Sequence, residues 1–238
     1  LILNKEGKKL SKRDGVTSVN DFRAMGYTAE ALANYMTLLG WSPPEGMGER
    51  FSLAEAANAF DFERVNKAGA RFDWDKLNWL NSQVLHELDP EDLRQRLLPL
   101  WQERGWAQGG ASADPEWQRE LCRLLGPSLV TLRDGVEQGE PFFTRPPLQE
   151  AALQQLELEG ARTALAALGE RLTPDPLDSA AAQELLNAAV AAAGVKKGVL
   201  MKSLRAALLG SLQGPDLLDT WLLLHRLGED KPRLERAL

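Results

Sequence analysis

Apolar residues recur three and four positions apart along most of the chain, which is the spacing of the buried face of an α-helix. Three clear examples are Leu32, Tyr35, Met36 and Leu39; Leu77, Leu80, Val84, Leu85 and Leu88; and Leu93, Leu97, Leu100 and Trp101. Strand signals are few, and the clearest is Leu1-Ile2-Leu3, which leads into a polar turn ending at Gly7. The pattern therefore predicts a mainly α-helical fold with roughly ten helices of ordinary length.

Helix boundaries are marked by residues that bond the free backbone groups of a helix end. Ser52 and Glu55 have the spacing of a capping box. Asp89-Pro90 and Asp114-Pro115 each place an N-cap acid before a proline at the first helical position. Glycines that favour helix ends follow the periodic segments, at Gly40, Gly105, Gly126, Gly169, Gly194 and Gly210.

Turn-rich joints divide the chain into helical segments. They lie at residues 108–112, 139–147 and 173–176, where glycine, proline and small polar residues gather. The third joint falls inside the last third of the chain. We expect three helical regions, at residues 1–88, 89–144 and 145–238.

Composition excludes several classes of protein. The 238 residues are 44% apolar and 26% charged with a net charge of -6, as in a folded protein. No apolar run approaches the roughly 18 residues of a membrane span, and the start is not typical of a signal peptide. One cysteine, Cys122, and two histidines cannot form a His/Cys zinc site. We expect a cytoplasmic monomer without zinc.

The densest positive cluster lies at the start of the chain. Its basic residues are opposed only by Glu6 within the first thirteen positions, and they are Lys5, Lys8, Lys9, Lys12 and Arg13. Lysines after a turn can close on a phosphate chain, although charge alone favours a solvated, lysine-rich terminus. The residues around Gly7-Lys8 lack the spacing of a Walker A loop.

The order of these residues is more specific than their charge. Lys9-Leu10-Ser11-Lys12-Arg13 resembles the KMSKS signature of class I aminoacyl-tRNA synthetases, in the form found in bacterial glutamyl-tRNA synthetases. The resemblance continues through the helix after the signature, a stem-contact region and terminal anticodon-binding helices. It is carried by Gly26-Tyr27, Leu38-Leu39-Gly40-Trp41-Ser42, Phe60-Asp61, Arg64-Val65, Ala70-Arg71-Phe72-Asp73, Lys76-Leu77-Asn78-Trp79-Leu80-Asn81 and Leu204-Arg205-Ala206-Ala207-Leu208.

The resemblance implies an enzyme that joins glutamate to tRNA(Glu) through a glutamyl-adenylate, using ATP and Mg²⁺. It implies that Lys9, Leu10, Ser11, Lys12 and Arg13 bind ATP. Lys12 would stabilise the departing pyrophosphate with assistance from Lys9, since a placed ammonium group lowers the energy of a transition state that gains negative charge.

One part of the family pattern is missing. The family also carries an HxGH-type motif on a nucleotide-binding sheet, whereas His86 and His225 lie in other contexts and no strand–helix alternation is present. We expect that the Rossmann catalytic domain precedes Leu1 and that these residues alone do not activate glutamate.

The last region carries the candidate anticodon site. Lys196, Lys197, Lys202 and Arg205 fall within ten positions, a pattern equally consistent with a solvated helix face. The resemblance implies that Arg205, Pro215 and Leu217 line the anticodon pocket. Gly214 stands where a relative has threonine, which removes any side-chain contact there.

Gly126 bears on which tRNA is accepted. The resemblance implies that members specific for tRNA(Glu) carry arginine at this position, and glycine offers no donor that a wrong third anticodon base would leave unpaired. The sequence therefore raises the hypothesis that tRNA(Gln) is also charged. The alternative is that Gly126-Pro127 only separates two helices.

Two other functions stay open. One is a stand-alone helical RNA-binding or scaffold protein, and the other is a relative that glutamylates a modified tRNA base, although such relatives end before the anticodon helices. His86 and His225 are interpreted as surface or boundary residues and Cys122 as a core residue. The tryptophans are interpreted as packing residues: Trp74, Trp79, Trp101, Trp106, Trp117 and Trp221.

Overall fold

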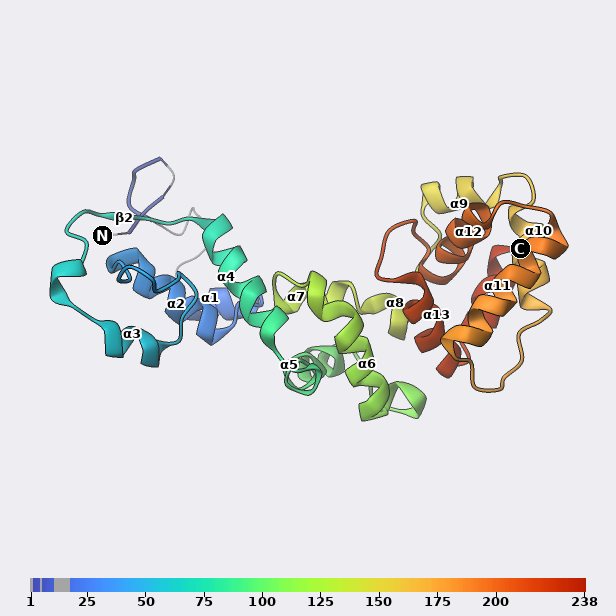
Figure 1. Ribbon diagram of the computed structural model, residues 1–238, viewed down its shortest axis with the longest axis horizontal. Helices are drawn as coiled ribbons and strands as arrows, with labels where there is room; N and C mark the ends of the chain where they lie inside the picture. The colour runs from blue at the N-terminus through green and yellow to red at the C-terminus, as the bar shows by residue number, and fades with distance from the viewer. Residues whose placement is uncertain (1, 5, 11–17) are drawn as a thin grey trace. The chain divides into compact units, whose positions relative to one another are not determined.

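The computed structural model describes residues 2–4, 6–10 and 18–238, and it is mainly α-helical as predicted (Figure 1). The chain forms two compact units. Unit 1 comprises Leu1–Leu97 with Gly126–Val136, and unit 2 comprises Leu98–Leu125 with Glu137–Leu238. The first boundary falls inside helix α5, next to Pro99, which cannot donate the helical hydrogen bond expected at its position. The three regions expected from the sequence stay a prediction.

Unit 1 combines helices with one very short sheet. Its elements are β1 (Ile2–Leu3), α1 (Val19–Ala24), α2 (Ala29–Gly40), α3 (Leu53–Ala59), the 3₁₀ turn η2 (Phe62–Arg64), β2 (Ala70–Arg71), α4 (Trp74–Glu87), the first part of α5 (Pro90–Glu103), η4 (Gly126–Ser128) and most of α7 (Leu132–Glu137). β1 and β2 pair in parallel, with Ile2 opposite Ala70.

The core of unit 1 lies between α2, α4 and this strand pair. Its largest members are aromatic, and Tyr35 packs edge-on against Phe72 with ring centroids 5.0 Å apart. The Tyr35 hydroxyl also accepts a hydrogen bond from the backbone N–H of Asp73 at 2.6 Å, and burial raises the pKa of Tyr35 to about 12. α2 is therefore joined to the start of α4, directly after β2.

A buried amide links three segments of unit 1. Asn81, on α4, accepts hydrogen bonds from the backbone N–H and the hydroxyl of Thr28, and it donates to the carbonyl of Val130 at 2.5 Å. Asn81 is fully buried and Thr28 is 3% exposed. Because buried polar groups are costly without partners, this amide fixes how the segment at Val130 packs on α4.

Unit 2 is a bundle of helices. It contains the end of α5, η3 (Gly110–Ala113), α6 (Pro115–Leu125), α8 (Glu140–Phe143), α9 (Glu150–Leu156), α10 (Ala161–Gly169), α11 (Ser179–Ala193), α12 (Lys197–Leu209), α13 (Leu217–Arg226) and α14 (Asp230–Ala237). α12 packs against α9, α10 and α14, and α10 also packs against α11 (Figure 1). Leu200, Leu204 and Leu208 of α12 are fully buried in this bundle.

The predicted helix starts are confirmed, whereas the predicted number of helices is too low. Ser52 and Glu55 form the predicted capping box, and α5 and α6 begin at Pro90 and Pro115. The described residues contain fourteen α-helices rather than about ten. The excess comes from short helices such as the four-residue α8, which are too brief to show a periodic apolar face.

Candidate functional site

The start of the predicted signature lies on a short hairpin in unit 1. The side-chain oxygen of Asn4 accepts hydrogen bonds from the backbone N–H groups of Glu6 (3.1 Å) and Lys8 (3.0 Å). The Asn4 N–H donates to the Lys8 carbonyl at 2.7 Å, and Lys9 forms an antiparallel bridge with Leu3. The asparagine thus closes the turn and brings Lys8 and Lys9 back beside β1.

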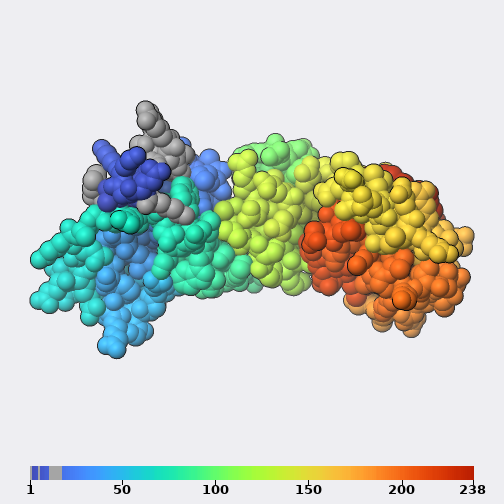
Figure 2. Space-filling view, turned by 90° about the horizontal axis from the view of Figure 1, so that it is seen from above, coloured from blue at the N-terminus to red at the C-terminus, as the bar shows by residue number. Residues whose placement is uncertain are grey.

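Leu10 anchors this hairpin to the core of unit 1. Its N–H donates to the Ile2 carbonyl at 2.9 Å, and its side chain packs against the buried cluster that contains Phe22 and Tyr35. Lys9, one position earlier, is exposed. The space-filling view shows these first residues, in dark blue, on the surface of unit 1 (Figure 2). The hairpin therefore presents Lys9 to solvent.

Lys8 and Lys9 of this hairpin keep their side chains exposed to solvent. Lys8 lies 3.3 Å from Glu6, and their side chains are 78% and 71% exposed. Exposed pairs of this kind contribute little because water screens them. Ser11, Lys12 and Arg13 lie outside the described residues, so the predicted role of Lys12 stays a prediction.

The candidate anticodon residues of unit 2 meet at the end of α12. Nη1 of Arg205 donates to the backbone carbonyl of Pro215 at 2.6 Å. Asp216 caps α13 by accepting from the N–H groups of Leu218 (2.8 Å) and Asp219 (3.0 Å). The guanidinium is thus held against the loop of residues 210–216, which joins α12 to α13.

Gly214 allows this loop to lie close to α12. Its φ of +149° lies in the region that side-chain-bearing residues rarely adopt. An added Cβ would be 2.5 Å from Cδ1 of Leu209 and 3.4 Å from Nη1 of Arg205. Leu217, the next residue after the Asp216 cap, is 5% exposed, so little of its side chain faces solvent.

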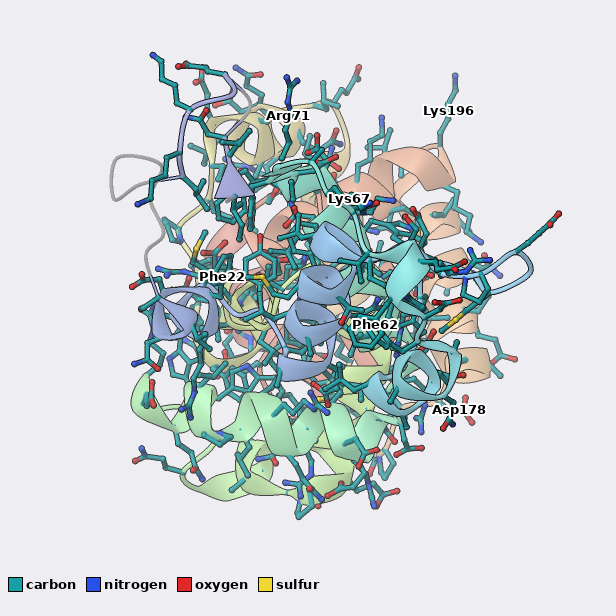
Figure 3. All side chains as sticks on the ribbon, turned by 90° about the vertical axis from the view of Figure 1, so that its left-hand side faces the viewer. Phe22, Phe62, Lys67, Arg71, Asp178 and Lys196 are labelled. Atoms are coloured by element: carbon teal, nitrogen blue, oxygen red, sulfur yellow. The ribbon has the colours of Figure 1, made fainter. Side chains whose placement is uncertain are left out.

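The other basic residues of α12 face solvent. Lys196 precedes the helix and its side chain extends away from the ribbon (Figure 3), while Lys197 and Lys202 are also exposed. Nζ of Lys197 lies 3.5 Å from the side-chain oxygen of Asn187. Arg205 is the partly buried member of the group.

Gly126 has no side chain and lies in a buried position where little space is left for one. It is buried directly after α6, and an added Cβ would lie 3.3 Å from Cδ2 of Leu93 on α5. A larger residue would therefore require Leu93 to move. Gly126 belongs to unit 1, whereas Arg205, Pro215 and Leu217 belong to unit 2.

A further exposed segment of unit 1 carries an aromatic side chain and charges of both signs. Residues 60–69 are exposed throughout, and Phe62 is 82% exposed. Figure 3 shows Lys67 and Arg71 on the same end of unit 1 as Phe62. Sequence reasoning missed Phe62 and Lys67, because exposure of an aromatic residue in a segment without helical periodicity has no sequence signal.

Several minor predictions are settled by burial. Cys122 is 1% exposed, and Trp101, Trp117 and Trp221 are buried as expected. Trp79 is instead 42% exposed, because it falls on the outer face of α4.

His225 is a half-buried residue at the boundary of unit 2, one of the two positions expected for it, and its side chain is 7% exposed.

Among residues 2–4, 6–10 and 18–238, no group of three or more His, Cys, Asp or Glu side chains is arranged to hold a metal ion. Within the same residues, no helix is long and apolar enough to span a membrane.

Residues 91–238 match the family described as "Anticodon binding domain". The chain belongs to that family. Residues 1–79 match a second family, "tRNA synthetases class I (E and Q), catalytic domain". The signature hairpin and the α12 site therefore lie in different family matches, in the order that the resemblance predicted.

Similar proteins extend this result to the whole chain. The chain is 66% identical over 238 residues to a glutamate–tRNA ligase of Synechococcus sp. (strain RCC307), and 61% identical over 241 aligned positions to that of Prochlorococcus marinus (strain MIT 9303). Each alignment covers 100% of this chain and 50% of the relative. The predicted resemblance to glutamyl-tRNA synthetases is confirmed, and the chain spans about half the length of the curated relatives it matches.

Solved structures agree with this family assignment. A glutamate tRNA ligase from Elizabethkingia meningosepticum, in complex with its amino acid, superposes with a TM-score of 0.84 at 28% identity over 100% of this chain and 50% of that one. A glutamate–tRNA synthetase from Elizabethkingia anophelis gives a TM-score of 0.79 at 28% identity, over 100% of this chain and 49% of that one. This member of the anticodon-binding family thus shares its helical architecture with ligases of known structure.

Proposed function

We propose that this chain is the tRNA-binding part of a glutamate–tRNA ligase. In this proposal, unit 2 reads the anticodon and unit 1 supplies the signature loop to the reaction that forms glutamyl-adenylate from glutamate and ATP. The observation that carries the proposal is the Arg205 site. A guanidinium held against a loop carbonyl, inside the segment that matches an anticodon-binding family, is arranged to meet unpaired bases.

The geometry of α12 supports direct recognition of RNA. One Nη of Arg205 is bonded to the Pro215 carbonyl, so the orientation of the planar group is set before RNA arrives. The rest of its donor set can then bond base edges or phosphates, for which a rigid fork is suited. Lys196, Lys197 and Lys202 add exposed positive charge that attracts the phosphate backbone.

We assign the catalytic contribution of this chain to the signature lysines. Lys9 stands exposed on a hairpin anchored by Leu10, and Lys12 follows within the same signature. An ammonium placed at the leaving pyrophosphate would lower the barrier to adenylate formation. ATP would therefore meet Lys9 and Lys12. The intact ligase would use Mg²⁺ together with ATP, as the resemblance to its family implies.

The 238 residues by themselves are proposed to bind tRNA without activating glutamate. The sequence has two histidines, and neither lies in an HxGH-type motif. The test is an assay of glutamate-dependent exchange between pyrophosphate and ATP. Exchange activity by this chain alone would overturn this part of the proposal.

Binding is tested by titrating fluorescent tRNA(Glu) with the chain at low salt, using Arg205→Ala and Arg104→Ala. Arg104 is an exposed arginine elsewhere in unit 2 and serves as the matched control. We expect Arg205→Ala to weaken binding about tenfold. Arg104→Ala should change it less than about twofold, as expected for a single exposed charge. Equal effects of the two variants would refute a specific anticodon site.

Acceptance of tRNA(Gln) is the finer part of this proposal. Gly126 has no side-chain donor, and an added Cβ there would lie 3.3 Å from Cδ2 of Leu93. Charging of tRNA(Glu) and tRNA(Gln) by the intact ligase, with glycine and with arginine at this position, tests it. We expect the wild type to charge both and Gly126→Arg to favour tRNA(Glu). Strict preference for tRNA(Glu) in the wild type would exclude dual charging.

A further inference from the structure

Arg233 is a fully buried arginine that contacts the same helix end as the anticodon site. Its side chain is 1% exposed, on α14. Nη1 donates to the Leu208 carbonyl in the last turn of α12 at 2.6 Å, and Nη2 donates to the Thr144 carbonyl at 2.9 Å. One planar group therefore ties the end of α12 to the segment that follows α8.

The charge of Arg233 is balanced by a carboxylate that also holds a second arginine. Burial lowers the pKa of Arg233, and Glu229, 3.4 Å from its Nε, acts in the opposite direction. Arg145 bonds both oxygens of the same carboxylate, at 2.6 and 2.9 Å, and this pairing lowers the pKa of Glu229. A buried cation with its donors occupied is rigid, because losing any one partner leaves a polar group unpaired.

The end of α12 is held from a second direction by the segment between α8 and α9. The N–H of Gln149 donates to the Gly210 carbonyl at 2.8 Å. Gly210 has a φ of +68°, and an added Cβ would lie within contact of the Pro147 carbonyl. Only glycine permits this approach, so the residues that follow Arg205 on α12 cannot shift without breaking these contacts.

We infer that Arg233 is a positioning residue for anticodon recognition, acting through Arg205. This inference rests on the proposed function of Arg205. Arg205 lies one turn before Leu209 and bonds the loop carbonyl of Pro215, so the place of its guanidinium depends on where α12 ends. Arg233 fixes that end through the Leu208 carbonyl. Arg233 does not itself touch RNA, because its side chain is buried.

The test uses Arg233→Lys, with Arg162→Lys as the matched control. Arg162 is an exposed arginine of unit 2 that donates to the backbone carbonyl of Leu238, and this bond reaches neither α12 nor the segment between α8 and α9. The readout is the ratio of affinities for the tRNA(Glu) anticodon stem-loop and for one with a changed anticodon base. We expect Arg233→Lys to lower this ratio about fivefold, because a lysine cannot bond both carbonyls in one plane. Arg162→Lys should leave the ratio unchanged.

A double-mutant cycle separates positioning from general destabilisation. In the Arg205→Ala background, Arg233→Lys should have no further effect on the ratio. A purely structural role would lower the melting temperature and leave the ratio of the folded protein intact, which would overturn the inference. Should Arg233→Lys fail to fold, Glu229→Gln gives the same test, since it removes the carboxylate that orients Arg233.

The cycle also distinguishes the two levels of the proposal. If Arg205→Ala does not alter the ratio, both the anticodon role of Arg205 and the positioning role of Arg233 are wrong. If Arg205→Ala lowers the ratio and neither Arg233→Lys nor Glu229→Gln does, only the positioning role is overturned.

Discussion

Nδ1 of His225 lies 2.8 Å from the carboxylate of Asp230, while its Nε2 lies 2.8 Å from the backbone carbonyl of Asp175. Both neighbours are acceptors, and the same carboxylate oxygen also accepts from the indole of Trp221. A neutral imidazole carries one N–H and can satisfy only one of these contacts, whereas the imidazolium satisfies both. The imidazolium form of His225 can therefore donate to both the loop before α11, at Asp175, and the start of α14, at Asp230.

The stability of unit 2 should depend on this proton. Burial alone would lower the pKa of His225, but its bonds to the Asp175 carbonyl and the Asp230 carboxylate raise it above the ordinary value. The other charged residues that line the same cavity of about 410 Å³ are Arg171, Asp175 and Glu184. With a raised pKa in the folded state, the stabilising contribution is complete below about pH 6.5 and is lost as the pH rises through the folded value.

The measurement is the difference in free energy of unfolding between wild type and His225→Gln, at pH 6 and at pH 8. We expect the difference to be larger at pH 6. Asp230→Asn is the control and should weaken the pH dependence, because it removes the carboxylate. An NMR titration midpoint of His225 at or below its ordinary value would contradict the prediction.

Asn81→Leu should destabilise unit 1 by about 1–3 kcal/mol, since the buried N–H of Thr28 then has no acceptor. Ser82→Ala, at the neighbouring and more exposed position, should change stability by less than about 0.5 kcal/mol. Urea denaturation measures both. A loss for Asn81→Leu no larger than that for Ser82→Ala would show that the amide is not a structural link.

Two glycines of unit 1 should respond oppositely to alanine. At Gly135, on α7, an added Cβ would lie 2.6 Å from Cδ2 of Leu97, which is fully buried and cannot move aside, so Gly135→Ala should cost about 1–3 kcal/mol. At Gly40, which ends α2, an added Cβ meets nothing within 4 Å. Gly40→Ala should therefore raise stability by about 0.4–1 kcal/mol. Thermal denaturation of both variants measures the two changes in stability. Changes of the same sign would contradict the packing argument.

In the intact ligase, Lys12→Ala should lower the rate of glutamate activation about a hundredfold or more while changing tRNA affinity less than about twofold. The reason is that its charge is proposed to act on the departing pyrophosphate. Lys8→Ala is the control, because Lys8 precedes the signature and pairs with Glu6 in solvent. Pyrophosphate exchange and tRNA titration give the two quantities, and comparable losses in both would remove the catalytic role.

The helices could be predicted because their signals are local. Ser52 and Glu55 cap α3 through bonds within four residues, and the prolines at 90 and 115 set the first turns of α5 and α6. The parallel pairing of β1 with β2 could not be predicted, since two-residue strands have no periodicity and their partners are far apart in sequence. The contact of His225 with the Asp175 carbonyl could not be predicted for the same reason, because the two residues are fifty positions apart.

The family could be predicted from the sequence, whereas the geometry of the candidate site could be predicted only in part. The order of residues 9–13 and the segment around Arg205 indicated the family, and the comparisons confirm it. The contact of Arg205 with Pro215 and the packing of Gly126 against Leu93 depend on how helices meet in space. Gly126 could be predicted to end a helix, but the sequence does not indicate that the side chain of Leu93 lies beside it.

The pairing of Ile2–Leu3 with Ala70–Arg71 has a consequence for synthesis on the ribosome. The strand that carries the lysine hairpin is made before its neighbour, which follows about seventy residues later. Parallel strands need a long crossover, and here the crossover includes α1, α2 and α3. The hairpin therefore reaches its final place late in translation of this region, after these helices have left the exit tunnel.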